Sequence, residues 1–233
     1  MIRIFAVLVG IFFSGWLLVS FVMGAVTFAT EEHVPSVEHE FHKHPSDAGL
    51  PSDGVFGQWD LAQLQRGLKV YKEVCSACHG LRHVAFGDLE DIGYSEGQAQ
   101  AIAAEFQVPS INPETGEAAT RPGVLADKFP SPYPNDTAAR AANNNALPPD
   151  LSLITKARHD GSNYVHALLT GYRNVETYRN ENGEALPDAN RPGTGLYFNP
   201  WFANLNLAMS PPLTSDGQVT FDDGTEATVD QMA

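Results

Sequence analysis

Cys75-Ser76-Ala77-Cys78-His79 is the most informative stretch of this 233-residue chain, and it contains the chain's only two cysteines. Its spacing fits the C-x-x-C-H signature of covalent haem attachment. Two thiols three positions apart can add across the two vinyl groups of a haem, and the adjacent histidine is then placed to bind the iron from one face. The pentapeptide therefore predicts a c-type electron carrier rather than a hydrolase, a nucleic-acid binder or a scaffold.

Other uses of a cysteine pair fit this stretch less well. A structural zinc site normally takes four Cys or His ligands in two spaced pairs, and the sequence has no second cysteine pair. A thioredoxin-like redox pair needs a flanking strand–helix–strand pattern, which is not evident nearby. Side chains three positions apart in a helix seldom meet disulfide geometry. A chance match with two idle thiols is the remaining alternative.

The chain offers few candidates for the second axial ligand of an iron. Methionine raises haem potential, and it is the expected partner of histidine in an electron-transfer site. Of the four methionines, Met1 is the initiator, Met23 lies in the apolar N-terminal run and Met232 is the penultimate residue, which leaves Met209. Two prolines close behind Met209 should stiffen its loop. Core packing is the alternative for Met209, and His83, His159 and His166 leave a bis-histidine site open.

The N-terminal region predicts export across a membrane. Residues 4–30 contain no charged side chain, and Arg3 precedes the run while two glutamates follow it. This charge pattern predicts that everything downstream of the run is exported. The run is longer than the h-region of a cleaved signal, about 7–15 residues, although residues 27–29 form a tolerable cleavage site. We interpret residues 1–30 as a signal peptide or, slightly favoured, an N-terminal transmembrane anchor.

A polar segment follows the apolar run. Residues 31–54 contain a histidine cluster made of His33, His39, His42 and His44. Such a cluster could bind a metal, but its irregular spacing favours a solvated tether that holds the domain off the bilayer. The soluble domain is then expected over residues 55–233.

The composition indicates an acidic domain rich in loops. With 20 glycines and 16 prolines, much of the chain should be irregular. The net charge of −14 argues against binding to nucleic acid or anionic lipid, and it suits a basic protein partner. The plain alternative is that the charge keeps the domain soluble.

Helical patterns surround the pentapeptide. Asp60 is expected to cap a helix whose apolar residues recur from Leu61 to Cys75, so that both cysteines lie at its C-terminal end. Gly80 offers a stop for that helix. Ser95 begins a second helix with a capping box.

The remaining pattern is sparser. Residues 162–170 predict a third helix, and residues 107–150 are rich in proline and read as a long ordered insertion loop. The fold class expected from these patterns is mainly α with long irregular loops.

Several segments together carry a family resemblance. They are YKEVCSACH (71–79), KFPSPY (128–133), AARAANN (138–144), ALPPDLS (146–152), LLTGY (168–172), GLYFNP (195–200) and FDDGT (221–225). Over about residues 54–233 the chain resembles cytochrome c1, the haem subunit of the ubiquinol–cytochrome c oxidoreductase, or bc1 complex. A generic soluble cytochrome c shares only the pentapeptide. The resemblance implies a class I cytochrome c-like domain with an extended insertion, preceded by an N-terminal hydrophobic helix.

The resemblance also implies a set of site residues. One haem c would be held by thioethers at Cys75 and Cys78, with His79 and Met209 as axial ligands of the iron. Arg121 would be a partner of a haem propionate, although a surface ion pair with an acidic side chain is the alternative for this arginine.

The implied function is electron transfer without substrate chemistry, so the chain would not be an enzyme on its own. The electron donor would be the Rieske iron–sulfur subunit and the acceptor cytochrome c, with cytochrome b as a further partner, in aerobic respiratory or photosynthetic transport. The implied location is the bacterial inner membrane, with the haem domain on the periplasmic side, rather than the mitochondrial inner membrane.

Rival functions fit the sequence less well, and the chain departs from the family pattern at two places. A membrane-anchored c-type subunit of another oxidase or dehydrogenase would lack the 107–150 insertion, a di-haem peroxidase needs two C-x-x-C-H motifs, and a gas sensor needs an open sixth position. Ser210 replaces the proline or alanine of many relatives. Residues 228–231 begin a capped helix that relatives continue into a C-terminal membrane anchor, so we expect a truncated chain, with a natural variant as the alternative.

Overall fold

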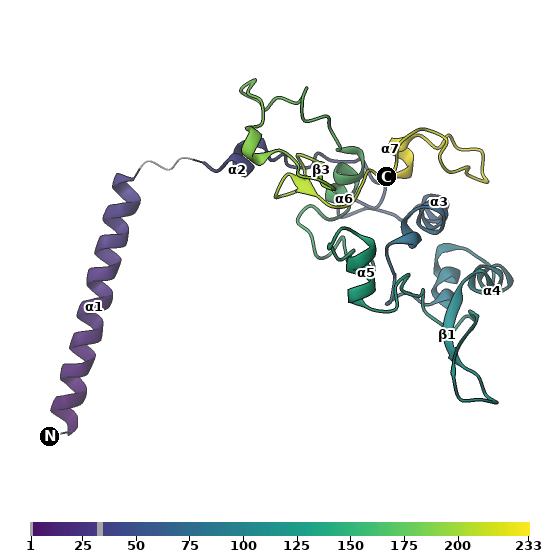
Figure 1. Cartoon of the computed structure of the whole chain (residues 1–233), viewed down its shortest axis with the longest axis horizontal. Coiled ribbons are helices and arrows are strands. Elements are labelled where there is room, and N and C mark those ends of the chain that lie inside the picture. Colours follow the sequence, from purple (N-terminus) through teal and green to yellow (C-terminus); the bar gives the residue numbers. More distant parts are fainter. Residues whose placement is uncertain (1, 32–34) are drawn as a thin grey trace. The chain divides into compact units, whose positions relative to one another are not determined.

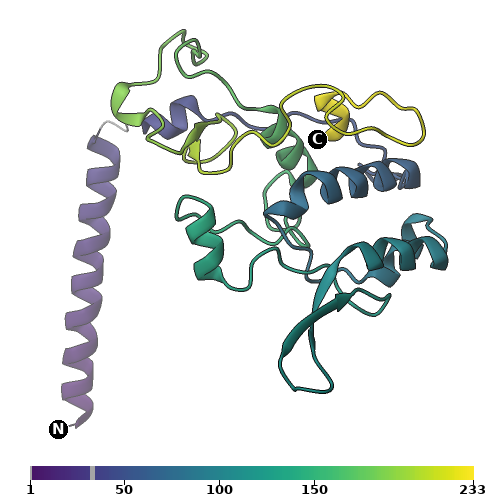
Figure 2. The ribbon, with the colours of Figure 1, turned by 45° about the vertical axis from the view of Figure 1, so that its right-hand side comes forward.

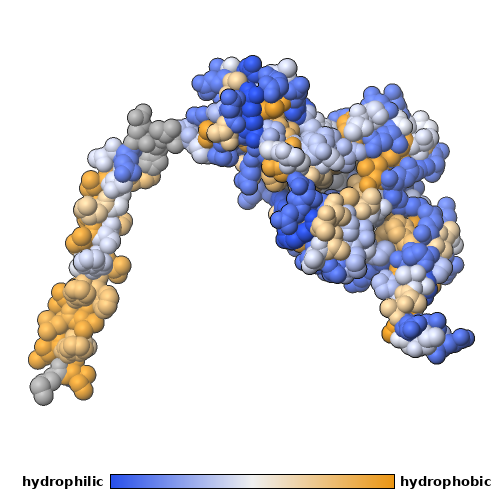
Figure 3. Space-filling view, in the orientation of Figure 1, coloured by the Kyte–Doolittle hydropathy of each residue, from blue (hydrophilic) through white to orange (hydrophobic). Residues whose placement is uncertain are grey.

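The computed structural model describes residues 2–31 and 35–233, which form two separate units, Met1–Ser36 and Val37–Ala233 (Figure 1). The described part of the first unit is dominated by one helix, α1 (Ile2–Thr30). None of this helix is buried, and it is long and apolar enough to cross a membrane, although a signal sequence near the N-terminus would pass the same test. Apolar side chains cover much of the visible face of α1 (Figure 3). The helix is therefore compatible with a transmembrane segment.

The second unit is mainly helical, as the sequence predicts. Its longer helices are α3 (Leu61–Glu73), α4 (Glu96–Glu105) and α6 (Gly161–Thr170), with α2 (Val37–Phe41), α5 (Asp136–Ala142) and α7 (Val229–Met232) as shorter ones. Three 3₁₀ turns are η1 (Cys75–Ala77), η2 (Phe86–Ile92) and η3 (Asp188–Asn190). The strands are β1 (Gln107–Ile111), β2 (Ala118–Pro122), β3 (Tyr197–Phe198) and β4 (Asn206–Leu207). Long loops connect these elements (Figure 2).

Helix α3 begins where its cap predicts and ends earlier than expected. The Asp60 carboxylate accepts hydrogen bonds from the backbone N–H of Ala62 at 2.9 Å and of Gln63 at 3.2 Å, which satisfies two donors of the first turn. At Val74 the backbone leaves the helical region, with φ −120° and ψ −58°. Cys75 therefore begins the 3₁₀ turn η1 and Cys78 caps its end, so neither cysteine lies on the helix, and Gly80 does not end α3.

The other predicted helix starts are confirmed. Ser95 and Gln98 form the capping box of α4, with Ser95 N–H donating to Gln98 Oε1 at 2.8 Å and Gln98 N–H to Ser95 Oγ at 3.3 Å. Thr228 caps α7 by accepting from Gln231 N–H at 3.1 Å. Helix α6 starts one residue before its predicted beginning and ends at the predicted Thr170.

The region 107–150 is not a plain loop. Strands β1 and β2 pair antiparallel from Gln107 opposite Pro122 to Ile111 opposite Ala118, and the hairpin extends away from the helices (Figure 2). Gly116 takes φ +72° in the connecting turn, a conformation that glycine adopts without strain. The prolines inside both strands hid the hairpin from sequence reasoning, because proline is normally tolerated only in edge strands. Both strands are edges of a two-stranded sheet.

Three apolar clusters form the core of the second unit. The first includes Leu68, Tyr71, Phe86, Leu89, Ala99, Ala103, Val108 and Phe129. The second includes Val70, Leu213, Val219, Phe221, Ala227 and Met232, and the third Phe41, Leu186, Phe198 and Leu205. Helix α3 supplies side chains to the first two clusters, and Cys75 packs against both. The pentapeptide is thus fixed between two parts of the core.

Part of the segment expected to be a solvated tether packs on the domain instead. Phe41, at the end of α2, is only 3% exposed and lies in the third cluster, with Val37 packed against it. Lys43 N–H donates to the Pro200 carbonyl at 2.7 Å. The two apolar residues are four positions apart, so α2 buries a single narrow face. His33 lies outside the described residues.

Candidate functional site

The 3₁₀ turn η1 presents the pentapeptide as one compact feature. The backbone N–H groups of Cys78 and His79 both donate to the Cys75 carbonyl, at 3.1 and 2.9 Å. Ser76 Oγ donates to the Lys72 carbonyl at 2.8 Å, which ties the turn to the end of α3. Both cysteines are half-buried and neither is in a disulfide. The two thiols are therefore available on the same turn, directly before the histidine.

Burial makes Cys75 a poor thiolate. Desolvation, with a smaller contribution from the neighbouring Cys78, raises the pKa of the Cys75 thiol to about 11. Since the thiolate is the form that binds zinc and exchanges disulfides, this environment disfavours both a metal-thiolate site and a redox pair. An uncharged thioether has no such penalty, because the sulfur then no longer titrates.

The His79 imidazole is oriented by a hydrogen bond to a distant segment. Its Nδ1 lies 2.7 Å from the carbonyl oxygen of Pro149. A carbonyl oxygen can only accept, so Nδ1 carries the proton and the lone pair of Nε2 is left for another partner. Iron and zinc ligands are commonly held in this way, with the second ring nitrogen bonded to a carbonyl. The backbone of His79 is held as well, because its carbonyl accepts a hydrogen bond from Tyr71 O–H at 3.0 Å.

The segment that follows Pro149 is fastened to the chain after the pentapeptide. Leu151 N–H donates to the Gly80 carbonyl at 2.9 Å, and Arg82 N–H donates to Asp150 Oδ2 at 2.9 Å. A Cβ on Gly80 would lie 3.2 Å from Asp150 Oδ2, so this close approach explains the glycine better than a helix stop does. Burial acts to raise the pKa of Asp150, but hydrogen bonds from Ser152 and the Arg82 backbone hold that pKa below its usual value.

The loop that carries Met209 is anchored to the same region of the core. Tyr172 O–H donates to the Met209 carbonyl at 2.9 Å. Leu213, four residues further on, is buried in the cluster against which Cys75 also packs. Met209 itself is half-buried. The structure thus brings the methionine loop and the pentapeptide to one apolar cluster, from positions more than a hundred residues apart in sequence.

Arg121 lies in β2 and is paired with Asp127. Its Nη1 and Nη2 donate to the two carboxylate oxygens at 2.5 and 2.8 Å. The hydrogen bond from Arg121, assisted by one from Val124 N–H, lowers the pKa of Asp127. The structure thus contains the ion pair with an acidic side chain that the sequence left open as the alternative for Arg121. The propionate role stays a prediction.

The histidines that kept a bis-histidine site open lie in other surroundings. His83 and His159 are exposed. His166 Nε2 lies 3.1 Å from Asp230 Oδ1, a bond that joins α6 to α7. Pro149 and Tyr172 lie in two of the segments that carry the family resemblance, but sequence reasoning missed their supporting roles, because each acts through a contact between segments far apart in the chain.

The donor set fits a covalently attached haem. Two half-buried thiols share one turn, an imidazole has its Nδ1 already engaged, and a thioether lies in a loop fixed to the same cluster. On either side of the Pro149 segment, Leu147 and Leu153 are left 38% and 55% exposed. Within residues 2–31 and 35–233, no three His, Cys, Asp or Glu side chains converge as a metal site.

Comparison with known proteins identifies similar sequences. Residues 50–233 match the Cytochrome C1 family. The chain is 43% identical over 213 residues to the mitochondrial heme protein cytochrome c1-2 of Solanum tuberosum, covering 91% of this chain and 76% of the relative. It is 44% identical over 187 residues to cytochrome c1 of Rhodospirillum rubrum, covering 77% and 68%. It is 41% identical over 204 residues to the mitochondrial cytochrome b-c1 complex catalytic subunit of Candida albicans, covering 88% and 66%. Other plant relatives are covered over 62% and 64% of their length.

Proposed function

Because the chain belongs to the cytochrome c1 family, we propose that it carries electrons from a Rieske iron–sulfur protein to cytochrome c within a bc1 complex. The observation that carries this proposal is the His79–Pro149 hydrogen bond, made by the histidine that directly follows two free cysteines. The bond fixes the imidazole in the tautomer that an axial iron ligand requires.

One haem c would be held by four side chains of this protein. Thioethers at Cys75 and Cys78 would attach it, and His79 Nε2 and the Met209 sulfur would bind the iron. A haem supplies reversible one-electron chemistry at its iron when it is bound, and an axial methionine raises the potential of that couple. The relatives from Solanum and Saccharomyces are themselves named heme proteins, which supports this cofactor.

The protein's own part is to hold this site rigid and partly dry. Proton donation from Nδ1 to the Pro149 carbonyl makes Nε2 more basic and fixes the ring plane. Tyr172 holds the backbone of the methionine loop, and Leu213 anchors the loop in the core. A site that does not rearrange when its charge changes is suited to electron transfer. The proposed function needs no residue here to make or break a substrate bond.

The proposed partners are the cytochrome b and Rieske subunits and a basic cytochrome c. The relatives named as a cytochrome b-c1 complex subunit and as cytochrome b/c1 support assembly into such a complex. The net charge of −14 would attract a basic acceptor. We place the haem domain on the periplasmic side of a bacterial inner membrane, supported by the apolar helix α1 and by Arg3 before its uncharged run.

Covalent attachment can be tested with the whole chain matured by a c-type haem assembly system. Acid–organic extraction should leave one haem on each wild-type chain. Cys78→Ala should keep one thioether and shift the pyridine haemochrome band towards that of a haem with one free vinyl group. Cys75→Ala with Cys78→Ala should retain none, whereas full extraction of haem from the wild type would contradict the proposal. His159→Ala, at an exposed histidine, is the matched control and should retain its haem.

A further inference from the structure

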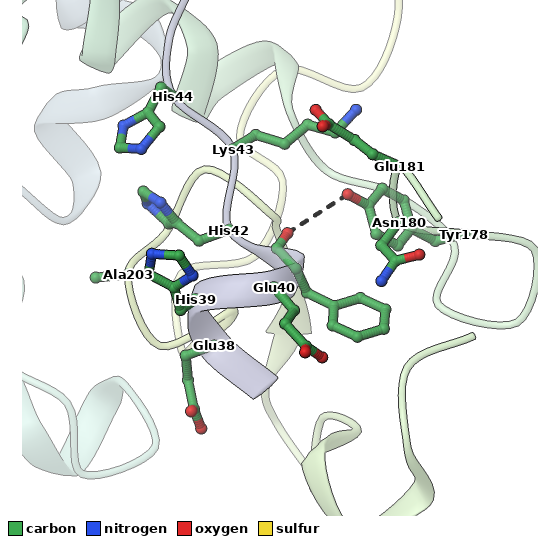
Figure 4. A pocket seen from close by; sticks show the side chains of 11 residues that line it. Glu38, His39, Glu40, His42, Lys43, His44, Tyr178, Asn180, Glu181 and Ala203 are labelled. Carbon is green, nitrogen blue, oxygen red and sulfur yellow. Dashed lines mark hydrogen bonds between the residues drawn. The ribbon is translucent and has the colours of Figure 1, made fainter. Parts of the chain in front are cut away.

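Three histidines gather on one surface of the second unit, away from the pentapeptide turn. His39 lies in α2, and His42 and His44 follow it in the irregular segment after the helix. Figure 4 shows the three imidazole rings on one side of this segment, while the side chain of Lys43 extends to the other side. Together with acidic side chains they line a cavity of about 680 Å³.

The spacing of these histidines explains why they share a side. His39 and His42 are three positions apart at the end of a helical turn, where side chains i and i+3 are neighbours. His42 and His44 are two positions apart in the irregular segment that follows, and their rings are in contact. Histidines whose spacing looked irregular in the sequence therefore lie on one side of this segment (Figure 4).

The His42 and His44 rings have a separation that suits one metal ion. Their centroids are 5.2 Å apart and the ring planes are nearly perpendicular, at 86°. With a Zn–N bond of about 2.0–2.1 Å and tetrahedral angles, two imidazoles on one zinc have centroids about 5 Å apart. The separation of the two rings therefore matches that of two imidazoles on one ion.

His42 is half-buried where it lines the cavity, whereas His44 is exposed. An ion held by both rings would therefore lie at the surface, within reach of solvent.

The charges around the cavity favour a cation. Glu38, Glu40 and Glu181 line it along with the histidines. The one lysine of the lining, Lys43, is turned away, with its Nζ 5.8 Å from the ring centroids of both Tyr178 and Trp201. The ammonium group of Lys43 therefore lies near aromatic rings rather than beside the imidazoles.

We propose that His42 and His44 form a binding site for one divalent transition-metal ion of the zinc class, independent of the haem. No three His, Cys, Asp or Glu side chains converge as they lie within the described residues, so the site commits to two imidazoles. Solvent completes the coordination, and His39 becomes a third ligand after rotation of its side chain. Imidazole and carboxylate groups are the ligands that zinc and its neighbours prefer among neutral and acidic side chains.

The test is equilibrium dialysis of the haem-loaded full chain against Zn²⁺ in a buffer that does not chelate metal. The wild type should bind one zinc ion. His42→Ala and His44→Ala should each raise the dissociation constant for zinc by about tenfold or more. His39→Ala should have a smaller effect, and His159→Ala, at an exposed histidine elsewhere, should have none. Haem-loaded protein is required because thioether formation removes the two cysteines as competing zinc ligands.

A folding control separates metal binding from the integrity of the segment. His42→Gln keeps a polar side chain of similar length without an imidazole, and thermal unfolding without zinc shows whether α2 stays packed. Zinc binding that is equally strong in the His42→Ala, His44→Ala double variant overturns the proposal. So does a loss in His159→Ala as large as in the cluster variants. Neither outcome depends on electron transfer, so the proposal stands or falls separately from the function of the haem site.

Discussion

His79 Nδ1 and the Pro149 carbonyl oxygen are 2.7 Å apart, although seventy residues separate them in sequence. This contact couples the pentapeptide to the segment 149–152. That segment is fastened in turn by Leu151 N–H, which donates to the Gly80 carbonyl, and by Asp150 Oδ2 and Ser152 Oγ, which accept from the N–H groups of Arg82 and His83. The orientation of the proposed iron ligand thus depends on a loop that supplies no ligand itself. Predictions about the site can therefore be made for residues outside the pentapeptide.

Gly80→Ala should loosen this coupling. The added Cβ would lie 3.2 Å from Asp150 Oδ2 and 3.4 Å from Ser131 Cα, so the loop must move to accommodate it. We expect the free energy of unfolding to fall by about 1 kcal/mol, within the usual range for overpacking. Gly97→Ala is the matched control, because nothing lies within 4 Å of its Cβ, and alanine should stabilise α4 by about 0.5–1 kcal/mol. Equal effects of the two changes in denaturant unfolding would contradict this account of Gly80.

Tyr172→Phe should weaken the methionine loop. The substitution keeps the ring but removes the O–H that donates to the Met209 carbonyl at 2.9 Å. Loss of such a bond costs about 0.5–1.5 kcal/mol. In the haem-loaded protein we expect faster displacement of the axial methionine by an added ligand such as imidazole. Tyr94→Phe, at a tyrosine packed against the first core cluster, is the control and should leave that rate unchanged.

Arg121→Gln should change the acid dependence of stability. The hydrogen bond from Arg121 lowers the pKa of Asp127 relative to the unfolded chain. The pair therefore contributes stability above the unfolded carboxyl pKa, and this contribution is lost as pH falls through the lower, folded pKa. The variant should be less stable than the wild type at neutral pH, and the difference should vanish in strong acid. Denaturant unfolding across pH checks this; a difference that persists unchanged into strong acid would count against the ion pair.

The same Arg121 variant also tests the propionate role. If the arginine pairs with Asp127 alone, the reduction potential of the haem should stay near that of the wild type. A clear fall in potential would show that Arg121 also stabilises the charge of a propionate, as the family resemblance implies.

Electron transfer to a basic cytochrome c should slow as ionic strength rises. Charges separated by more than about 10 Å are largely screened at 0.1 M salt, so attraction by the acidic surface weakens. Stopped-flow oxidation of the reduced protein over a range of salt concentrations measures this directly. A rate that does not change with ionic strength would exclude steering by the net charge of −14.

Features with local causes could be predicted from the sequence. The caps at Asp60, Ser95 and Thr228 act within one turn, so the starts of α3, α4 and α7 agree with their sequence signals. The end of α3 at Glu73 could not be predicted, because the chain leaves the helix to form a 3₁₀ turn packed between two core clusters. The hairpin β1–β2 could not be predicted either, because proline within a segment argues against a strand.

The candidate site likewise has features that the sequence predicts and contacts that it does not. The C-x-x-C-H spacing and the single eligible methionine are visible in the sequence, and the structure brings both segments to one cluster through Cys75 and Leu213. The contacts from Pro149 and Tyr172 that orient them depend on tertiary packing, and the segments that contain these residues do not reveal the contacts. The helix α2 was likewise missed, because five residues with one buried face give little periodicity to detect.

The central claim is that His79 and Met209 are the two axial ligands of a covalently bound haem, and optical spectroscopy of Met209→Leu tests it most directly. The oxidised wild type should show the weak far-red band of methionine–iron ligation, and the variant should lose that band and fall in reduction potential while keeping its covalent haem. Met232→Leu, at a buried methionine in the C-terminal helix, is the matched control and should keep the band. A band that is missing from the wild type, or that persists in Met209→Leu, would contradict the assignment.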